Sequence, residues 1–473
     1  MSLSSVPAEV LEEITEHLSP SRLCYENDFK PDAEYHHRRA ALVALSKTNR
    51  RLNAFANKVL YRTLDATVGN LGALLKTLVV HARLQELVRV LNITWPVSDD
   101  EEQPDTYSIT YPHWEAVWRT AMVTGGADFL CWHYDETACA FLVTILGNVE
   151  AVYLVYSPCE TQGSGYDMYE SLERALFLHT PRLLCISRAG GPIDEFLDEP
   201  EDWLVSAESV QPLLYNTFLA RSTGPRELEL RGAMLSVKGT LDSFQAGSWS
   251  NLEAIKIEDS FVTGPWFHRL CYESRPRLKR VDISITPYLR EAIWEHCPGS
   301  QEPGYNGALA LCASTLRYLR LDNISSHELG KAGALTCLPG LIHLKYLEAD
   351  PEVIFDWHPM KDADVFDHLP PSLEVISLRD DFCKGERRPE SDEWAAENSL
   401  ALRRIMLQLV LGSEQKIPRL RKVQISYDPL DETTEIWNLD EEVELQGLYS
   451  VEVRPLKWDR RMIDCATLQG KSM

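Results

Sequence analysis

Long apolar runs are missing from this chain of 473 residues, in which no stretch approaches the roughly eighteen uninterrupted apolar residues of a membrane-spanning helix. The chain also lacks a positively charged start followed by an apolar core and a small-residue cleavage site, which is the pattern of a secretory signal peptide. These absences predict a protein that binds no membrane and stays in the cytoplasm, the nucleus or both.

Cysteine pairs and an excess of positive charge are missing too. The eleven cysteines are odd in number and contain no CxxC pair, which favours reduced, buried thiols over a disulfide framework or a zinc site. Lys and Arg number 47 against 71 Asp and Glu, giving a formal net charge of -24. A charge of this sign opposes approach to the phosphates of nucleic acids, so we expect no nucleic-acid partner.

The common catalytic motifs are absent as well. The sequence contains no GxxxxGK[ST], no GxGxxG after a strand, no HExxH and no GxSxG, and it has too many carboxylates for spacing to single out an acid/base pair. Adjacent His36 and His37 are poorly placed to share a metal. We expect no cofactor, no metal and no catalytic residue. An enzyme whose catalytic groups lie far apart in sequence is the alternative.

The composition that is present belongs to a folded protein. Hydrophobic residues make up 44% and charged residues 25% of the chain, close to the globular average. The length exceeds what a single core supports, so we expect a small domain joined to a larger one, or a repeat. Tryptophans could supply contacts on a binding face, although core packing is the commoner role. The residues considered for this are Trp114, Trp118, Trp132 and Trp266.

The first helical pattern is VPAEVLEEITEHL, residues 6–18. Its apolar side chains recur at helical spacing while glutamates occupy the other faces, and Pro7 suits a first helical turn because its missing N–H would be unpaired there. The apolar positions are Val6, Val10, Leu11, Ile14 and Leu18. The pattern predicts an amphipathic helix.

A second pattern, ALVALSKTNRRLNAFANKVLYRTL, covers residues 41–64 and gives two short helical faces with Asn49 as a cap or turn between them. Its apolar positions are Leu42, Leu45, Leu52, Phe55, Val59 and Leu60. Three short helices enclose only a small core, so a partner is the natural supplement to their burial.

These segments, in this order, resemble the F-box of fungal proteins, a three-helix module that docks on the Skp-type adaptor of cullin-RING ubiquitin ligases. The resemblance covers roughly residues 4 to 64, and it predicts a helical module at residues 1–64 with a long insertion at residues 19–39. By this resemblance Pro7 takes the place of the motif's Leu-Pro proline, and Val6 replaces its leucine. The adaptor-binding positions that it implies are Val6, Pro7, Val10, Leu11, Ile14, Leu18, Leu42, Leu45 and Leu52. A generic helical cap on a larger domain is the alternative.

The rest of the chain repeats a short phrase, Leu-x-x-Leu-x-Leu with Val and Ile allowed. Clear copies begin at Leu252, Leu278, Leu316, Leu344, Leu373, Leu420 and Leu448, and weaker ones at Val88, Val149, Leu183 and Pro225. From Pro225 on, the starts are separated by 27, 26, 38, 28, 29, 47 and 28 residues. Most of these intervals lie near the upper end of the range of leucine-rich repeats, about 20 to 29 residues.

We therefore predict an α/β fold in which the helical module precedes an irregular leucine-rich-repeat-like solenoid, residues 65–473, with a parallel sheet. The first, fourth and sixth residues of each phrase should pack inward, and residues such as Glu253 and Lys256 should line a concave outer surface. Helical returns are expected at residues 237–245 and 401–412. An ordinary α/β domain whose strands share the phrase is the alternative.

The resemblance implies a non-catalytic substrate-recognition subunit of an SCF-type ubiquitin ligase. Its partners would be a Skp-type adaptor, through it a cullin, and an unidentified protein target held by the solenoid. The alternative from a different class is an F-box-like scaffold or interaction protein that binds a partner without assembling a ligase.

Overall fold

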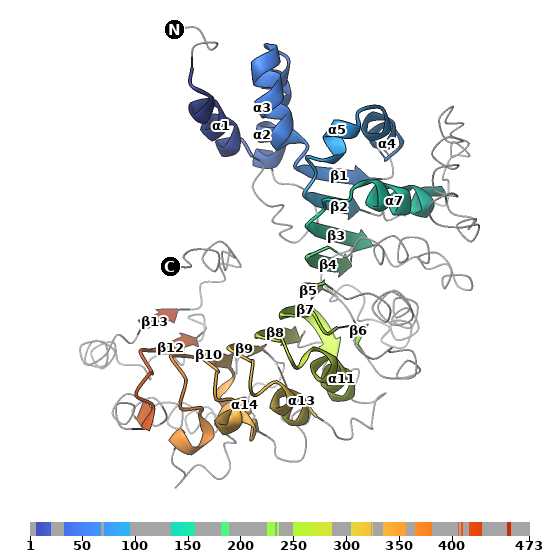
Figure 1. Cartoon of the computed structure of the whole chain (residues 1–473). Helices are drawn as coiled ribbons and strands as arrows, with labels where there is room; N and C mark the ends of the chain where they lie inside the picture. The colour runs from blue at the N-terminus through green and yellow to red at the C-terminus, as the bar shows by residue number, and fades with distance from the viewer. Residues whose placement is uncertain are drawn as a thin grey trace, which may run out of the picture. The chain divides into compact units, whose positions relative to one another are not determined.

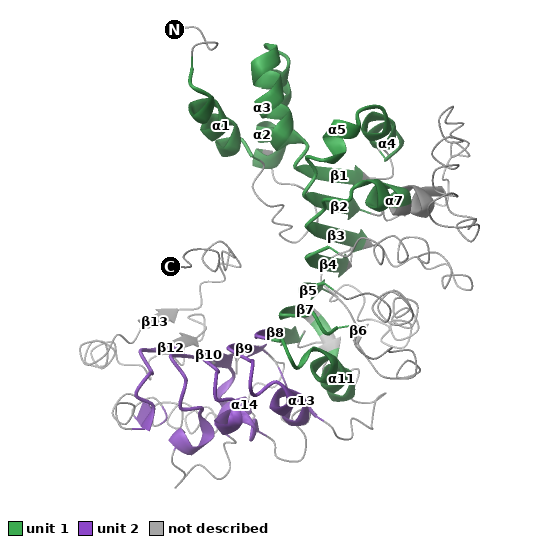
Figure 2. Ribbon diagram, in the orientation of Figure 1, with its two compact units in different colours: residues 1–278, 283–300 green, residues 279–282, 301–473 purple. Residues whose placement is uncertain are grey.

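A computed structural model describes the residues that follow, and all structural statements concern them. They are residues 6–19, 33–67, 71–94, 134–156, 181–188, 225–231, 234–235, 249–285, 304–322, 324, 334–355, 365–380, 405, 408–409, 416–427 and 452–455. The chain divides into two compact units (Figure 2). Unit 1 comprises residues 1–278 and 283–300, and unit 2 comprises residues 279–282 and 301–473. The predicted boundary at residue 64 stays a prediction.

Unit 1 begins with three helices, as the sequence predicts: α1 (Ala8–His17), α2 (Ala33–Ser46) and α3 (Arg50–Leu60). The predicted insertion was too long, because α2 begins at Ala33 and takes up the last part of residues 19–39. His36 and His37 therefore lie on a helix, where both are exposed, and not in a loop. The polar sequence around Tyr35 hid this helical turn, which the buried Tyr35 side chain anchors at 2% exposure.

The helices share a small core. Leu42 of α2 packs with Ala56, Val59 and Leu60 of α3, and Leu18 and Leu45 lie against this cluster half-buried. Asn49 caps α3, as predicted, because its side-chain oxygen accepts a hydrogen bond of 2.9 Å from the N–H of Leu52. The cap and the core together determine where α2 ends and α3 begins.

The sheet of unit 1 runs in the order β1, β2, β3, β4, β5, β7, with every neighbouring pair parallel (Figure 1). The bounds are β1 (Thr63–Thr67), β2 (Val90–Thr94), β3 (Ala151–Tyr156), β4 (Leu183–Arg188), β5 (Glu227–Arg231) and β7 (Ala254–Val262), with the short β6 (Met234–Leu235) paired to β7. The remaining helices described in this unit are α4 (Leu71–Val80), α5 (Ala82–Gln85), α7 (Tyr134–Ile145) and α11 (Gly264–Ser274).

Unit 2 contains the first residues of β8 (Arg280–Ile285) and continues through β9 to β13, each paired in parallel with the next. The bounds are β9 (Tyr318–Asp322), β10 (Tyr346–Ala349), β11 (Val375–Asp380), β12 (Lys422–Tyr427) and β13 (Glu452–Pro455). Its helical segments are α13 (Tyr305–Leu311), η6 (Leu338–Gly340), α14 (Pro351–Phe355) and η7 (Val365–His368).

The repeated phrase accounts for these strands, since each of its eleven copies coincides with one of β2 to β5 or β7 to β13. In the copy that begins at Leu316, the first, fourth and sixth residues are Leu316, Leu319 and Leu321, and all three are fully buried. The predicted α/β fold with a repeated parallel sheet is therefore confirmed. β1 and β6 were not predicted as strands, because β1 overlaps the end of the F-box pattern and β6 has only two residues.

The remaining expectations about the fold concern tryptophans, helical returns and membrane-spanning helices. Trp266 lies on α11 at 2% exposure and is a core residue, whereas Trp114, Trp118 and Trp132 lie outside the described residues. The predicted return at residues 237–245 lies outside them too, as does most of residues 401–412. Among the helices that the structure describes, none has the length and apolar character needed to cross a membrane.

Candidate functional site

Helix α1 has one buried face and one exposed apolar face. Leu11 and Thr15 point inward at 2% and 1% exposure, and the Thr15 hydroxyl donates a hydrogen bond of 2.9 Å to the carbonyl of Leu11. Val10 and Ile14, one turn apart, are 41% and 42% exposed. Because residues four apart lie side by side on a helix, these two form a small apolar surface, the α1 apolar pair.

Ion pairs link α1 to α3 and to Arg62, which follows α3 in the chain. The Lys58 ammonium contacts the Glu12 carboxylate, and Arg62 Nη1 lies 3.1 Å from Glu16 Oε2. Exposed pairs like these contribute at most about 1 kcal/mol each, so they orient the helix more than they stabilise it.

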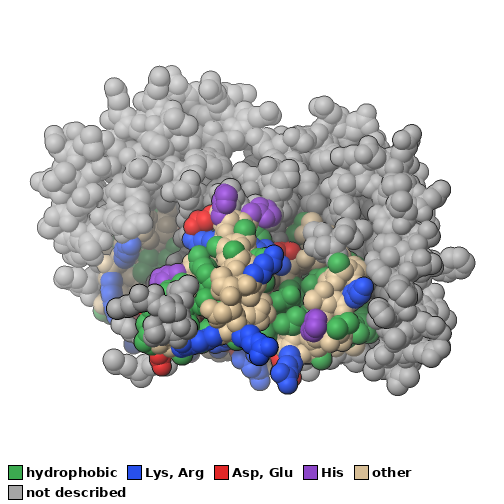
Figure 3. Space-filling model, turned by 90° about the horizontal axis from the view of Figure 1, so that it is seen from above, with side chains coloured by type: hydrophobic (Ala, Val, Ile, Leu, Met, Phe, Trp, Pro, Cys, Tyr) green, Lys and Arg blue, Asp and Glu red, His purple; other side chains and the backbone are tan. Residues whose placement is uncertain are grey.

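Figure 3 shows the molecule from above, turned by 90° from the view of Figure 1. On this face, hydrophobic side chains of the described residues lie among Lys, Arg and His side chains.

The nine predicted adaptor-binding residues fall into two groups. Leu11, Leu42 and Leu52 are buried in the module's own core, and Leu18 and Leu45 are half-buried beside it. The other four lie at the beginning of α1 and along its exposed side: Val6 half-buried, and Pro7, Val10 and Ile14 exposed. The structure thus buries Leu11, Leu42 and Leu52 and leaves Pro7, Val10 and Ile14 exposed. Adaptor contact by the nine residues stays a prediction.

The helical module is linked to the first strands of the same unit through Asp65 of β1. The Tyr35 hydroxyl of α2 donates to Asp65 Oδ2, and the Asn92 side-chain amide of β2 donates to Asp65 Oδ1 at 2.8 Å. Arg39 of α2 lies 3.9 Å from the same carboxylate. A half-buried carboxylate with several donors holds its partners in one geometry, so α2 is attached to the sheet by more than the chain alone.

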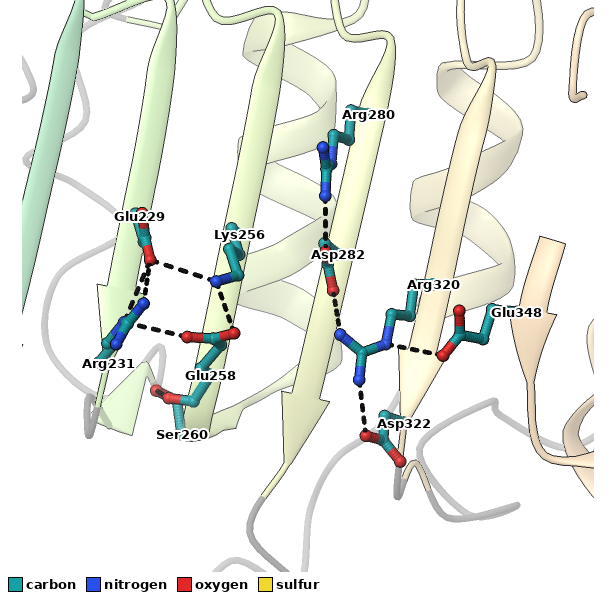
Figure 4. A network of polar contacts seen from close by, with 10 residues as sticks. All are labelled: Glu229, Arg231, Lys256, Glu258, Ser260, Arg280, Asp282, Arg320, Asp322 and Glu348. Atoms are coloured by element: carbon teal, nitrogen blue, oxygen red, sulfur yellow. Dashed lines mark hydrogen bonds and ion pairs between the residues drawn. The ribbon is translucent and has the colours of Figure 1, made fainter. Parts of the chain in front are cut away.

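A network of four charges, the unit 1 network, lies on the face of β5 and β7 opposite the leucines (Figure 4). The Arg231 guanidinium lies 2.7 Å from Glu229 and 3.0 Å from Glu258. Lys256 closes the square at 3.3 Å from Glu229 and 2.6 Å from Glu258. Two acids alternate with two bases, so the network is neutral and each charge has two opposite neighbours.

These neighbours decide the ionisation of the network. Burial alone would raise the pKa of Glu229, but Lys256 and Arg231 outweigh burial and hold that pKa below its ordinary value. Burial would likewise lower the pKa of Lys256, but Glu229 and Glu258 raise it. Glu229, Arg231 and Lys256 are therefore charged at neutral pH.

Unit 2 carries a second network, the unit 2 network, on β8, β9 and β10. The Arg320 guanidinium lies 3.4 Å from Asp282, 3.3 Å from Asp322 and 3.0 Å from Glu348 (Figure 4). Arg280 pairs with Asp282 at 3.0 Å. Asp282 is fully buried. One guanidinium thus binds a carboxylate from each of three neighbouring strands.

Aromatic rings continue this network one row along the strands. The Arg280 guanidinium carbon lies 4.5 Å from the centre of the Tyr318 ring, which is stacked on Tyr346 with centroids 4.5 Å apart and an interplanar angle of 2°. The Tyr346 hydroxyl donates to Glu348. Burial, followed by the charge of Asp282, raises the pKa of Tyr318 well above its ordinary value, so the ring stays neutral. These side chains form a polar surface on β8, β9 and β10 that is suited to contact with a partner.

Sequence reasoning missed both networks, although the signal was present in the phrase. In LKRVDI, LRYLRL and LKYLEA the third and fifth residues are charged or aromatic. In parallel strands in register these positions lie side by side, as Tyr318 does with Tyr346 and Arg320 with Glu348. Aligning the phrases by position would have placed these side chains in rows. Within the described ranges, no group of three or more His, Cys, Asp or Glu side chains is arranged to hold a metal ion.

Comparison with known proteins adds little to this description. No protein-family model matches the chain, and no curated protein matches it. Among solved structures, the crystal structure of the yeast complex of Rad7 and Elc1 is similar over 82% of this chain and 88% of that one, at 16% sequence identity and a TM-score of 0.32. At this identity and TM-score, the similarity supplies no argument about this chain's partners or activity.

Proposed function

We propose that this protein is a substrate-recognition subunit of an SCF-type ubiquitin ligase. In this role the helical module binds a Skp-type adaptor, and through it a cullin, while the repeat sheet holds a protein target. The observation that carries the proposal is the α1 apolar pair, Val10 and Ile14, which stays exposed on a helix whose opposite face is buried. The F-box resemblance places an adaptor contact at these positions.

The size of the module supports a partner at this face. Among the described residues, its core cluster consists of Leu42, Ala56, Val59 and Leu60, with Leu18 of α1 packed half-buried against it. Burying the exposed parts of Val10 and Ile14 under a partner would remove further apolar surface from water, at about 25 cal/mol per Å². Adaptor binding would therefore stabilise the module as well as recruit the ligase.

Catalysis by such a subunit needs no reacting group of its own. Holding the adaptor at one surface and the target at another raises the effective concentration of target lysines near the ubiquitin-charged enzyme. The two charged networks suit the target-holding role because their side chains are already oriented by one another before binding, which lowers the entropy lost on association.

The test is co-purification of the adaptor with the full chain carrying Val10→Asp and Ile14→Asp. We expect adaptor recovery to fall at least roughly tenfold, because two carboxylates cannot be buried at an apolar contact without a large penalty. The matched control is Val79→Asp with Val80→Asp on α4, since these residues are also exposed, at 41% and 62%. The control should leave adaptor recovery unchanged.

Equal adaptor recovery by the wild type and the α1 variant would overturn the proposal. A blot for the cullin on the same samples separates a ligase subunit from the alternative scaffold. A ligase subunit brings down adaptor and cullin together, whereas a scaffold without ligase assembly brings down neither. Leu11 is unsuitable for this test, because at 2% exposure its replacement by Asp would disrupt the core.

A further inference from the structure

The residue directly before each strand is charged in β1 to β5 and in β7 to β12. Eight of these residues are basic and three acidic: Arg62, Arg89, Glu150, Arg182, Arg226, Glu253, Lys279, Arg317, Lys345, Glu374 and Arg421. The chain as a whole has the opposite balance, with 47 Lys and Arg against 71 Asp and Glu. The positions directly before the strands therefore carry an excess of positive charge, although the chain as a whole is acidic.

In unit 2 the backbone aligns these residues in a row. The carbonyl of Lys279 accepts from the N–H of Arg317 at 2.8 Å, that of Arg317 from Lys345 at 2.9 Å, that of Lys345 from Glu374 at 2.8 Å, and that of Glu374 from Arg421 at 2.8 Å. Neighbouring strands lie about 4.8 Å apart, so the row from β8 to β12 spans roughly 19 Å.

The row in unit 2 is open and has an excess of cations. Lys279, Arg317, Lys345 and Arg421 are all exposed, and exposed Arg419 lies beside them. The one acid in the row, Glu374, accepts from Lys345 at 2.8 Å. This hydrogen bond, followed by the charges of Lys345, Arg421 and Arg419, holds the pKa of Glu374 below its ordinary value. The five cations form what we call the basic edge.

The corresponding row of unit 1 is less basic. It contains Arg62, Arg89, Arg182 and Arg226 together with two acids, Glu150 and Glu253. The basic edge of unit 2 has five cations to the one acid Glu374. It is therefore the better surface for an anionic ligand.

We infer that the basic edge binds an extended acidic segment of the protein target. This rests on the proposed function only in calling the ligand a target. An extended chain rises about 3.4 Å per residue, so roughly six residues span the edge. Charge complementarity favours carboxylate side chains in such a segment.

The rest of the protein selects a short ligand over a long polyanion. Charges more than about 10 Å away are largely screened at 0.1 M ionic strength, so a short segment at the edge interacts mainly with the local cations. A long nucleic acid or an anionic membrane extends beyond the edge and meets a chain with a formal net charge of -24. A short peptide segment is the ligand that fits both conditions.

The test measures fluorescence anisotropy of a fluorescein-labelled hexaglutamate peptide with the full chain, against a hexaglutamine peptide. We expect salt-sensitive binding of hexaglutamate alone. Arg317→Glu with Lys345→Glu should weaken it roughly tenfold, since two cations become acids. The matched control, Lys76→Glu with Arg83→Glu, makes the same charge change at exposed residues of α4 and α5 and should change affinity less than about twofold.

A variant with higher affinity distinguishes an effect of charge from a loss of binding through misfolding. Glu374→Lys removes the acid of the row and should tighten hexaglutamate binding roughly threefold, a result that a damaged fold cannot produce. No binding of hexaglutamate by the wild type, or equal weakening in the edge variant and its control, would overturn the inference. So would tighter binding of a thymidine oligonucleotide or of phosphatidylserine vesicles than of hexaglutamate.

The inference and the proposed function fail separately. Adaptor co-purification is measured on the same variants, and the edge variant should retain the adaptor because its substitutions lie in unit 2. In one outcome the variant with Val10→Asp and Ile14→Asp loses the adaptor, but the wild type binds no hexaglutamate. This outcome would refute peptide binding by the basic edge and leave the proposed function intact. In the other outcome the wild type binds hexaglutamate, but no sample contains the adaptor. This outcome would refute the ligase role and leave the inference about the basic edge intact.

Discussion

The role of a side chain in the repeat depends on the face of the sheet on which it lies. Leu319 and Leu321 are fully buried, whereas Tyr318 and Arg320, which alternate with them along the strand, belong to the polar surface. Truncating either leucine would leave a cavity, and the free energy of unfolding falls by about 2 to 5 kcal/mol in such cases. Replacing a polar residue of the opposite face instead changes charge and contact.

At the residue scale, Glu229→Gln should lower the stability of unit 1 by about 2 kcal/mol at pH 7, because two charge-assisted contacts are lost. The pKa of Glu229 is held below 4.5 in the folded state. The stability that ionised Glu229 contributes is therefore complete above about pH 4.5 and is lost as the pH falls through the lower folded-state pKa. The difference between wild type and variant in the amide hydrogen-exchange protection of β5 and β7 should shrink below that pH.

Glu227→Gln is the matched control for this measurement, because Glu227 lies on the same strand in a more exposed pair with Arg182. Its effect at pH 7 should stay within about 0.5 kcal/mol. A Glu229→Gln difference that persists unchanged to pH 3 would contradict the argument that ionisation of this carboxylate is responsible.

At the scale of elements, the residues of α1 that pack inside the module differ from those that we propose to contact the adaptor. Its inward residues Leu11 and Thr15 join the module's core, and its outward residues Val10 and Ile14 do not. Such a helix keeps its position without the partner, because Leu11 is buried and Leu18 packs against the core cluster, while the ion pairs of Glu12 and Glu16 orient it. The apolar pair is then presented in a fixed orientation before binding.

Leu11→Ala and Ile14→Ala should therefore have opposite consequences. Leu11→Ala leaves a cavity and should lower the local stability of the helical module by about 2 to 5 kcal/mol, while Ile14→Ala changes it by no more than about 0.5 kcal/mol. Amide hydrogen exchange in α1 to α3 measures this locally, which suits a chain too large for a single unfolding transition. Ile14→Ala should nonetheless weaken adaptor binding. Equal protection losses in the two variants would contradict the division of α1 into two faces.

At the scale of the whole molecule, the proposed role is that of a connector with two binding surfaces, one on α1 and one on the repeat sheet. Ligases of this kind act by effective concentration, so losing either surface abolishes transfer while leaving the other able to bind. The consequence is that a chain unable to bind its adaptor should still hold its target.

The chain carrying Val10→Asp and Ile14→Asp should accordingly retain targets that the wild type releases to degradation. Proximity labelling in cells should recover a set of proteins several-fold more abundantly with this variant than with the wild type. Adding Arg317→Glu and Lys345→Glu should remove the part of that set that the basic edge recruits. Identical protein sets at identical abundance with the wild type and the α1 variant would count against a receptor role.

Much of the architecture follows from the sequence alone. The phrase predicts eleven strands, their inward residues and their parallel pairing, because alternate residues of a strand face opposite sides and one copy cannot bury its apolar side by itself. The helical stripes and the cap at Asn49 are also predicted, since both depend on spacing within a few residues. Local periodicity is what carries these predictions.

The tertiary structure alone decided which residues of each pattern meet and which stay open. Val10, Leu11 and Ile14 belong to one stripe in the sequence, yet of these three only Leu11 is buried. The carboxylates gathered around Arg320 come from strands whose separation in the chain depends on irregular intervals, so contact was decided by register. Periodicity defines the faces of an element, but only the neighbours that fold against it determine which part of a face remains for a partner.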